Sequence, residues 1–271
     1  FPNDDWLILE GDSVEDVEVA KRKVLETYAK NKAVNSGLRS VISKLLYDYI
    51  DNGNAFAEVI WVNETHTDPV TGVESTTYMG PRALRISPFD IVFNPAAVDF
   101  GKSVKFRRYM KSLGEIKKEM KTRTDLQFDE KVFQQVMDKR RELSSFNKED
   151  IDKAEGYLAD GFGTLSEYYG SGIVELIEFE GDYYDSTNDV LHENQIITII
   201  DRTQIIRQID NPNWLGKDNK VHVGWRDRPD NLYAMGPLDN LVGMQYRLDH
   251  LENFNADAMD QTIMPPVKII G

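Results

Sequence analysis

Histidine and cysteine are the residue types that most often bind metals or act as catalytic groups. The chain has 271 residues with no cysteine, which excludes a disulfide framework, a thiolate metal site and a cysteine nucleophile. The four histidines lie on different predicted elements without the spacing of a zinc-binding helix, so they do not predict a zinc site. These are His66, His192, His222 and His250.

An acidic cluster at 178–189 (EFEGDYYDSTND) is the best candidate for metal binding. Carboxylate oxygens at short intervals are the ligands that Ca²⁺ takes. Counting from Asp182, Glu193 falls at the twelfth position of an EF-hand loop, but Tyr184 and Thr187 occupy the third and sixth positions, where that loop needs a ligand and a glycine. The match is poor, and a polar hairpin tip between Phe179 and Ile196 is the favoured explanation of the cluster, with a calcium site as the alternative.

Motifs for phosphate binding and nucleophilic catalysis are incomplete. Gly161-Phe162-Gly163 lacks the third glycine of a dinucleotide-binding loop, and no GK[ST] sequence is present. Ser87 precedes Pro88 and lies in no nucleophile elbow. We therefore expect a protein that is not an enzyme, with no catalytic residue, no metal and no cofactor.

The elements that would position any site alternate between helices and strands. Helical spacing predicts helices at 16–32, 38–50, 128–143 and 148–158, with Asn35 or Ser36 capping the second. Alternation and β-branched runs predict strands at 55–62, 77–86, 89–94, 104–108, 173–179, 195–202, 204–209 and 220–225, the last closing a second sheet. We expect a hairpin loop at 65–76 and a capping box formed by Ser112 and Glu115.

Composition predicts a folded protein with an acidic surface. Hydrophobic residues make up 41% of the chain, and no apolar run approaches the length of about 18 residues that a membrane span needs. The net charge of −14 argues against tight binding of DNA phosphates. Basic residues cluster at 102–123 and 139–141, where a solvated helix face is favoured over a DNA contact. Because the chain begins with Phe1, we expect a fragment or a trimmed product.

A long helix is predicted from Pro237 to Ile263, about 40 Å in length. Pro237 suits the first helical turn, and Asp239 places a negative charge near the positive end of the helix. The apolar residues at spacings of three and four form one narrow stripe, which suits packing against copies of the same helix. They are Leu238, Leu241, Met244, Leu248, Leu251, Phe254 and Ala258.

Four segments carry a resemblance to one protein family. They are the helix, Gly-Asn-Ala turn and strand at 45–61 (LLYDYIDNGNAFAEVIW), the strand pair at 82–95 (RALRISPFDIVFNP), the helix entry at 233–240 (YAMGPLDN) and the Pro-Pro exit at 265–270 (PPVKII). In this order they resemble the portal proteins of tailed bacteriophages, especially the podovirus-like type. The resemblance covers roughly a third of the chain.

The resemblance implies an α+β fold, a portal-like wing of mixed helices and antiparallel strands followed by a long stem helix. It implies a homo-oligomeric ring, typically of twelve copies, at one vertex of the capsid in the virion, assembled in the host cytoplasm. Double-stranded DNA would pass through the ring during packaging and ejection. The terminase large subunit, the head-tail adaptor and the capsid protein would be its partners, ATP hydrolysis would belong to the terminase motor, and no membrane is involved.

The same resemblance divides the chain into six regions. They are an N-terminal helical region (1–50), a first β-rich part of the wing (51–111), a helical insertion with a glycine-rich connection (112–172), a second β-rich part (173–230), the stem helix (231–264) and the start of a clip strand (265–271).

Two functional hypotheses follow. In the first, Gly236 and Pro237 set the entry of the stem helix, and its polar residues face a neighbouring subunit or the channel. These polar residues are Asp239, Gln245, Arg247, Asp249, Asn253 and Asp257, and an ordinary exposed helix face is the alternative. In the second hypothesis, the chain is a calcium-dependent or carbohydrate-type binding module with its site at the Asp182–Asp189 tip, which predicts a monomer with the long helix buried on a sheet.

Overall fold

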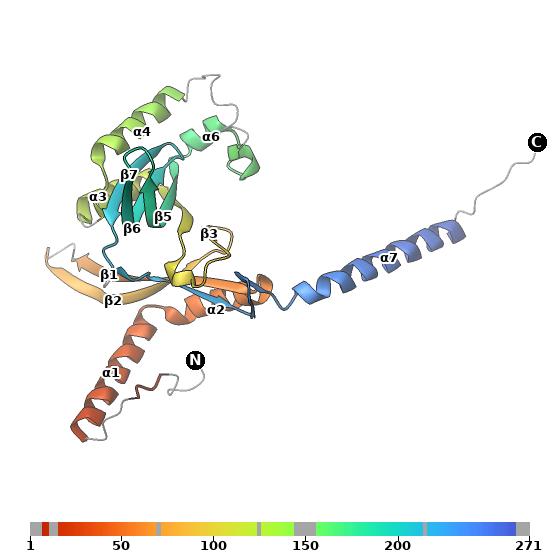
Figure 1. Cartoon of the computed structure of the whole chain (residues 1–271), viewed down its shortest axis with the longest axis horizontal. Helices are drawn as coiled ribbons and strands as arrows, with labels where there is room; N and C mark the ends of the chain where they lie inside the picture. Colours follow the sequence, from red (N-terminus) through yellow and green to blue (C-terminus); the bar gives the residue numbers. More distant parts are fainter. Residues whose placement is uncertain are drawn as a thin grey trace, which may run out of the picture. The chain divides into compact units, whose positions relative to one another are not determined.

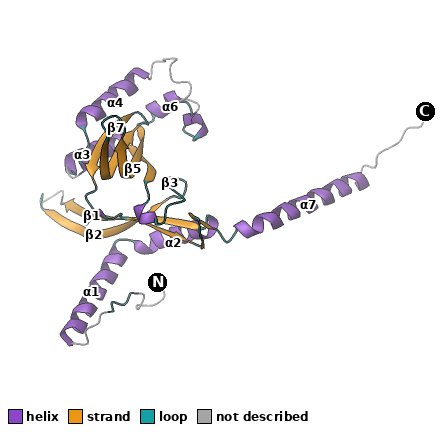
Figure 2. Cartoon of the chain, in the orientation of Figure 1, coloured by secondary structure: helices purple, strands orange, loops and turns teal. Residues whose placement is uncertain are grey.

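The computed structural model describes residues 7–10, 16–68, 72–123, 126–143, 156–213 and 216–263. It contains two compact units, one formed by Phe1–Pro88 with His222–Gly271 and the other by Phe89–Val221. Both units combine helices with β-strands, and the paired strands of the larger sheet run antiparallel (Figure 1 and Figure 2). The expected α+β class is therefore confirmed.

The first unit packs helix α2 against a three-stranded sheet of order β2-β1-β8. The strand expected at 220–225 exists as β8, but it lies beside β1, so the expectation that it closes the second sheet is wrong. Local alternation fixes the two faces of a strand but not its neighbour. The elements are α1 (Asp16–Asn35), α2 (Leu38–Asp51), β1 (Asn54–Thr67), β2 (Glu74–Ile86), β8 (Lys220–Gly224), β9 (Arg226–Arg228), β10 (Asn231–Met235), η4 (Asp239–Leu241) and α7 (Val242–Ile263).

Glycine, not a polar side chain, separates α1 from α2. Gly37 precedes α2 with φ of 73°, and no side chain caps this helix. Ser36 instead donates its hydroxyl to the carbonyl of Ala33, within the last turn of α1. The expected cap by Asn35 or Ser36 is therefore wrong, because the chain leaves α1 through the left-handed conformation that glycine adopts without steric cost.

The β1–β2 hairpin is longer than the sequence suggests. Its strands pair from Phe56 opposite Ile86 out to Thr67 opposite Glu74, with a bulge between Glu64 and Thr65. The loop expected at 65–76 is thus partly strand. The outer residues of both strands are exposed, so backbone pairing and β-branched threonines maintain the ladder without a buried face that alternation could reveal.

The second unit is a five-stranded antiparallel sheet of order β3-β4-β5-β6-β7. Strands β3 and β4 follow β2 in the chain but join the sheet of β5, so the two sheets do not follow the order of the sequence. The elements are β3 (Ile91–Phe93), η1 (Phe100–Lys102), β4 (Lys105–Ser112), α3 (Leu113–Thr122), α4 (Glu130–Leu143), α6 (Leu165–Gly170), β5 (Ile173–Asp185), β6 (Val190–Ile200) and β7 (Gln204–Asp210).

Helices α3 and α4 cover one face of this sheet and form its hydrophobic core (Figure 1). Ile116 of α3, Val136 of α4 and Leu176 of β5 are at most 3% exposed. The capping box at the start of α3 is confirmed, because Ser112 accepts from the Glu115 amide at 3.2 Å and donates its own amide to the Glu115 carboxylate at 2.8 Å. Most of the helix expected at 148–158 and the clip strand at 265–271 lie outside the described residues.

Two of the residues expected on a solvated basic face are buried in this unit. Lys105 is 2% exposed and pairs with Asp218 at 2.7 Å. Arg140 is 4% exposed and holds Asp201 with two hydrogen bonds of 2.7 and 3.0 Å. The expectation of a solvated face is wrong for these two, because each cation meets a carboxylate from a distant part of the chain. Lys117, Lys118 and Lys121 do face solvent.

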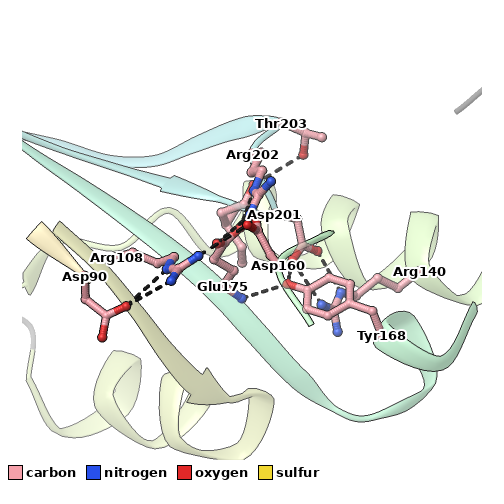
Figure 3. Close-up of polar contacts among 10 residues, drawn as sticks. Asp90, Arg108, Arg140, Asp160, Tyr168, Glu175, Asp201, Arg202 and Thr203 are labelled. Carbon is pink, nitrogen blue, oxygen red and sulfur yellow. Dashed lines mark hydrogen bonds and ion pairs between the residues drawn. The ribbon is translucent and has the colours of Figure 1, made fainter. Parts of the chain in front are cut away.

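Arg140 belongs to a buried polar network that joins α4 and α6 to the sheet (Figure 3). The Tyr168 hydroxyl donates to Asp201 at 2.7 Å and accepts the amide of Glu175 at 2.8 Å. Arg202 in turn donates to the Glu175 carboxylate at 2.5 and 2.9 Å. Asp201 and Arg202 both have positive φ, at 50° and 56°, a conformation that costs roughly 1–2 kcal/mol for each residue with a side chain. The network holds this turn in place.

Replacing Arg140 with methionine should lower the free energy of unfolding by about 3–5 kcal/mol, because Asp201 stays buried without its cationic partner. Urea unfolding followed by circular dichroism measures this change. Arg141→Met is the matched control, since its side chain is 72% exposed and its removal should change stability by no more than about 0.5 kcal/mol. Equal effects of the two substitutions would contradict the structural role of the network.

Candidate assembly site at the base of the long helix

Asn54 joins the first strand of the chain to the segment that leads into α7. Its side-chain amide donates to the carbonyl of Ala234 at 3.0 Å, and its side-chain oxygen accepts the amide of Ala234 at 2.8 Å. The Asn54 amide also donates to the carbonyl of Asn52 at 2.9 Å. Both Asn54 and Ala234 are at most 6% exposed. One side chain therefore satisfies both backbone groups of a buried residue 180 positions away.

His222 completes this contact from β8. Its Nε2 lies 3.0 Å from the Asn54 side-chain oxygen, and its ring stacks on Phe56 with centroids 4.7 Å apart. The two bonds to Ala234 fix which side-chain atom of Asn54 is the oxygen, and because an amide oxygen only accepts, the proton of neutral His222 lies on Nε2. Burial lowers the pKa of His222 below its ordinary value, and the charge of Asp227 only partly opposes this.

Two glycines allow the backbones to touch beside Asn54. Gly53 has φ of 69°, and a Cβ at this position would lie 2.4 Å from the Gly236 Cα. The amide of Trp225 donates to the Gly53 carbonyl at 2.8 Å, and the Trp225 ring lies 5.1 Å from that of Tyr49. Any side chain at Gly53 would therefore separate the two segments.

A salt bridge ties the preceding helix to the end of the hairpin. Arg85 of β2 donates to both carboxylate oxygens of Asp48 in α2, at 2.5 and 2.6 Å. Asp48 is 5% exposed, whereas Arg85 is about one-third exposed. The pair holds α2, which ends just before Gly53, against the strand next to β1.

The chain enters α7 through a short 3₁₀ turn. The Gly236 amide donates to the Asp239 carboxylate at 2.8 Å, and Leu241 donates to the carbonyl of Leu238 at 2.8 Å. The regular helix begins only at Val242, so the start expected at Pro237 is wrong. Asp239 binds the amide before the proline instead of the amides of α7, and this delays the helix by about one turn.

Every described side chain of α7 is exposed to solvent. The exposed fraction is 69% for Met244, 54% for Leu248 and 59% for Leu251. A soluble helix normally covers its apolar stripe with the rest of the fold. Among the described residues nothing covers this stripe, so α7 presents an apolar surface to solvent.

The polar residues expected on this helix are equally exposed. Gln245 donates to Asp249 at 2.8 Å, one turn along the same helix. Within the described ranges, the side chains of Arg247, Asn253 and Asp257 make no hydrogen bond or ion pair. The structure thus places the predicted residues on α7 and on the segment just before it, and the hydrogen bonds that connect described residues of this set are Gly236–Asp239 and Gln245–Asp249.

The alternative site at the Asp182–Asp189 tip is the turn of the β5–β6 hairpin. Asp185 accepts the amide of Thr187 at 2.9 Å and the side-chain amide of Asn188 at 2.7 Å. Asp189 accepts the hydroxyl of Tyr184 at 2.6 Å. The carboxylates thus stabilise their own turn, and among the described residues no group of three or more histidine, aspartate or glutamate side chains is arranged to hold a metal ion.

Sequence reasoning missed the role of Asn54 and His222. The Gly53-Asn54 pair predicts a turn, and a lone histidine in a short strand predicts nothing specific. Asn54 lies in the segment 45–61, which carries part of the family resemblance, and His222 lies in the segment that leads directly into the helix entry. Their membership of these two segments is the sequence signal that could have drawn attention to them. Only the fold shows that the Asn54 side chain spans between them.

Comparison with models of known protein families and with curated proteins finds no match to this chain. No helix among the described residues is long and apolar enough to cross a membrane.

Replacing Asn54 with alanine should expose the backbone of Ala234 to exchange. The substitution leaves a buried N–H and a buried C=O unpaired, at a cost of about 1–3 kcal/mol for each group. Hydrogen exchange should accelerate at the Ala234 amide, and the free energy of unfolding should fall. Asn63→Ala is the control, because Asn63 is exposed on the same strand. Unchanged protection at Ala234 would contradict the proposed geometry.

The stability of the first unit should fall as the pH drops below the ordinary histidine pKa of about 6.5. The folded state holds the pKa of His222 below that of the unfolded state, so the unfolded chain takes up the proton first. Unfolding measured from pH 7.5 to 5 should show this loss. His222→Gln keeps a donor near Asn54 but does not titrate, so its profile should be flatter, whereas His250→Gln should retain the wild-type slope.

Proposed function

We propose that this chain is a portal subunit whose copies form a ring at one capsid vertex, with α7 as the stem helix. Double-stranded DNA passes through the ring during packaging and ejection. The observation that carries the proposal is the complete exposure of the apolar stripe on α7. Removing such a stripe from water is favourable, and copies of the same subunit can supply the surface that covers it.

The position of the family-like segments supports the same assignment. The segments at 45–61, 82–95 and 233–240 are separated in the sequence, and their order carries the resemblance. Asp48, Arg85, Asn54 and Ala234 join them at the base of α7. A shared structural task, fixing the entry of the long helix, accounts for the presence of all three segments in one chain.

The charge of the chain agrees with a channel that lets DNA slide. With 46 acidic and 32 basic residues, the protein lacks the excess of cations that tight phosphate binding requires. On α7 itself, Arg247 is the only basic residue against Asp249, Glu252, Asp257 and Asp260. A weakly repelling surface keeps a duplex from adhering to the wall.

In this role the protein performs no chemistry and binds no cofactor. The ring would be a dodecamer, the terminase large subunit would dock on it during packaging, and the head-tail adaptor would replace the motor afterwards. The capsid protein would surround it. These partners follow from the resemblance alone.

Introducing charge into the apolar stripe should abolish assembly without unfolding the subunit. We expect Leu248→Asp with Leu251→Asp to convert rings into monomers, as seen by negative-stain electron microscopy and light scattering. Both side chains are more than half exposed, so the melting temperature should stay within a few degrees of the wild type. Tyr246→Asp with Asn253→Asp adds the same charge on the side of the helix opposite Leu248 and should leave rings intact.

Monodisperse wild-type monomers at both low and high salt would overturn the ring. Calcium titration of the Asp182–Asp189 tip would then test the alternative binding module. A heat signal that Asp185→Asn removes would support that alternative.

A further inference from the structure

We propose that residues 156–170 form a strap that opens from the second unit as one piece, with the salt concentration setting how often it opens. Asp160 and Tyr168 of the strap lie beside Asp201 and Arg202, which lie in the turn between β6 and β7 (Figure 3). Opening uncovers a polar surface that the closed structure buries, since Asp201 is only 3% exposed. The inference does not depend on the proposed ring, because it concerns contacts within one subunit.

The strap carries an aromatic cluster of its own. The rings of Tyr157 and Tyr168 stack with centroids 4.5 Å apart, and the ring of Phe162 lies 5.7 Å from the first and 5.4 Å from the second. None of the three belongs to the hydrophobic core that α3 and α4 form with the sheet. A separate cluster of this kind can open as a unit while the main core stays packed.

Polar contacts attach the strap to the sheet. One is buried, where the Tyr168 hydroxyl donates to Asp201 at 2.7 Å. The other lies nearer the surface, where Asp160 accepts from Arg202 at 2.5 Å and is 3.8 Å from the guanidinium of Arg108. These last three side chains are each about one-third exposed, so dissolved salt screens the attraction among them. A higher salt concentration therefore weakens the closed state.

The turn that receives the strap is strained. Asp201 and Arg202 are consecutive residues with φ of 50° and 56°, in the left-handed region that favours glycine. Both hold the strap, the first through Tyr168 and the second through Asp160 and the ring of Tyr157, whose centroid is 4.7 Å from the guanidinium carbon. Such strain persists only where surrounding contacts enforce it, and it often marks segments that switch. Release of the strap lets the turn relax, which favours opening.

Hydrogen exchange measures the opening, because amides bonded inside the strap exchange when it opens. The amides of Asp160, Phe162 and Tyr168 donate to carbonyls of the strap itself. We expect these three amides to share one opening equilibrium, while the amides paired between β5 and β6 stay protected. Raising the salt concentration from about 0.01 M to about 1 M shortens the Debye length from about 30 Å to about 3 Å, so it should increase opening.

Two buried tyrosines of the strap provide a matched pair of substitutions. Tyr168→Phe removes the bond to Asp201 together with the acceptor of the Glu175 amide. Tyr157→Phe removes a hydroxyl that makes no hydrogen bond among the described residues. We expect Tyr168→Phe to increase the opening equilibrium about tenfold or more, because a bond to a charged group is lost, and Tyr157→Phe to change it by less than about twofold.

A second pair of substitutions tests the ionic contact. Asp160→Asn should increase opening about threefold at low salt and remove most of its salt dependence, because the carboxylate no longer attracts Arg202. Asp138→Asn removes the same charge from α4, where the side chain is 55% exposed and lies outside the strap. This control should leave both the opening equilibrium and its salt dependence as in the wild type.

Three results would overturn the strap. Exchange of its amides only together with the amides of the β5–β6 ladder would mean that the whole unit opens at once. Different opening equilibria for the three strap amides would indicate fraying instead of a single piece. Opening of the wild-type strap that does not respond to salt would exclude an ionic attachment. The ladder amides, recorded in the same experiment, show whether a variant has unfolded as a whole, and the wild-type salt series does not rely on any variant.

Discussion

The paired hydrogen bonds between Asn54 and the backbone of Ala234 are the constraint on which the first unit depends. They connect the start of β1 with the strand before α7, although the whole second unit lies between them in the sequence. Their strength comes from burial, because an unpaired amide or carbonyl at this place could not recover a bond to water. Gly53 and Gly236 contribute by adding no side chain that would hold the backbones apart.

The second unit uses a different principle, in which buried charged side chains lie beside one or two charges of opposite sign. Burial alone would raise the pKa of Glu178, but the charges of Lys220 and Arg207 outweigh it, so the pKa lies below its ordinary value. Such pairs seldom add net stability over apolar residues of similar size. Removing one partner of such a pair is costly, however, because the other charge then stays buried without compensation.

Sequence patterns predict where the helices and strands lie better than they predict which elements pack or pair with each other. Helices α1, α2 and α4, most strands and the Ser112 capping box follow from local spacing. The partner of β8 and the burial of Lys105 and Arg140 could not be predicted, because both depend on which distant segment lies alongside. The start of α7 was misplaced for a physical reason as well, since the Asp239 carboxylate binds the Gly236 amide and forms a 3₁₀ turn first. The Asn54 contact lies in the same class of long-range interactions.

The exposed stripe on α7 also bears on how such subunits would meet. Apolar attraction acts only at contact, whereas the net charge of −14 repels over a Debye length of about 10 Å at 0.1 M salt. Free subunits therefore encounter a barrier before their helices touch, and the barrier shrinks as counterions accumulate. If the copies form the proposed ring, the same repulsion opposes every addition, so a higher salt concentration should speed each step of association.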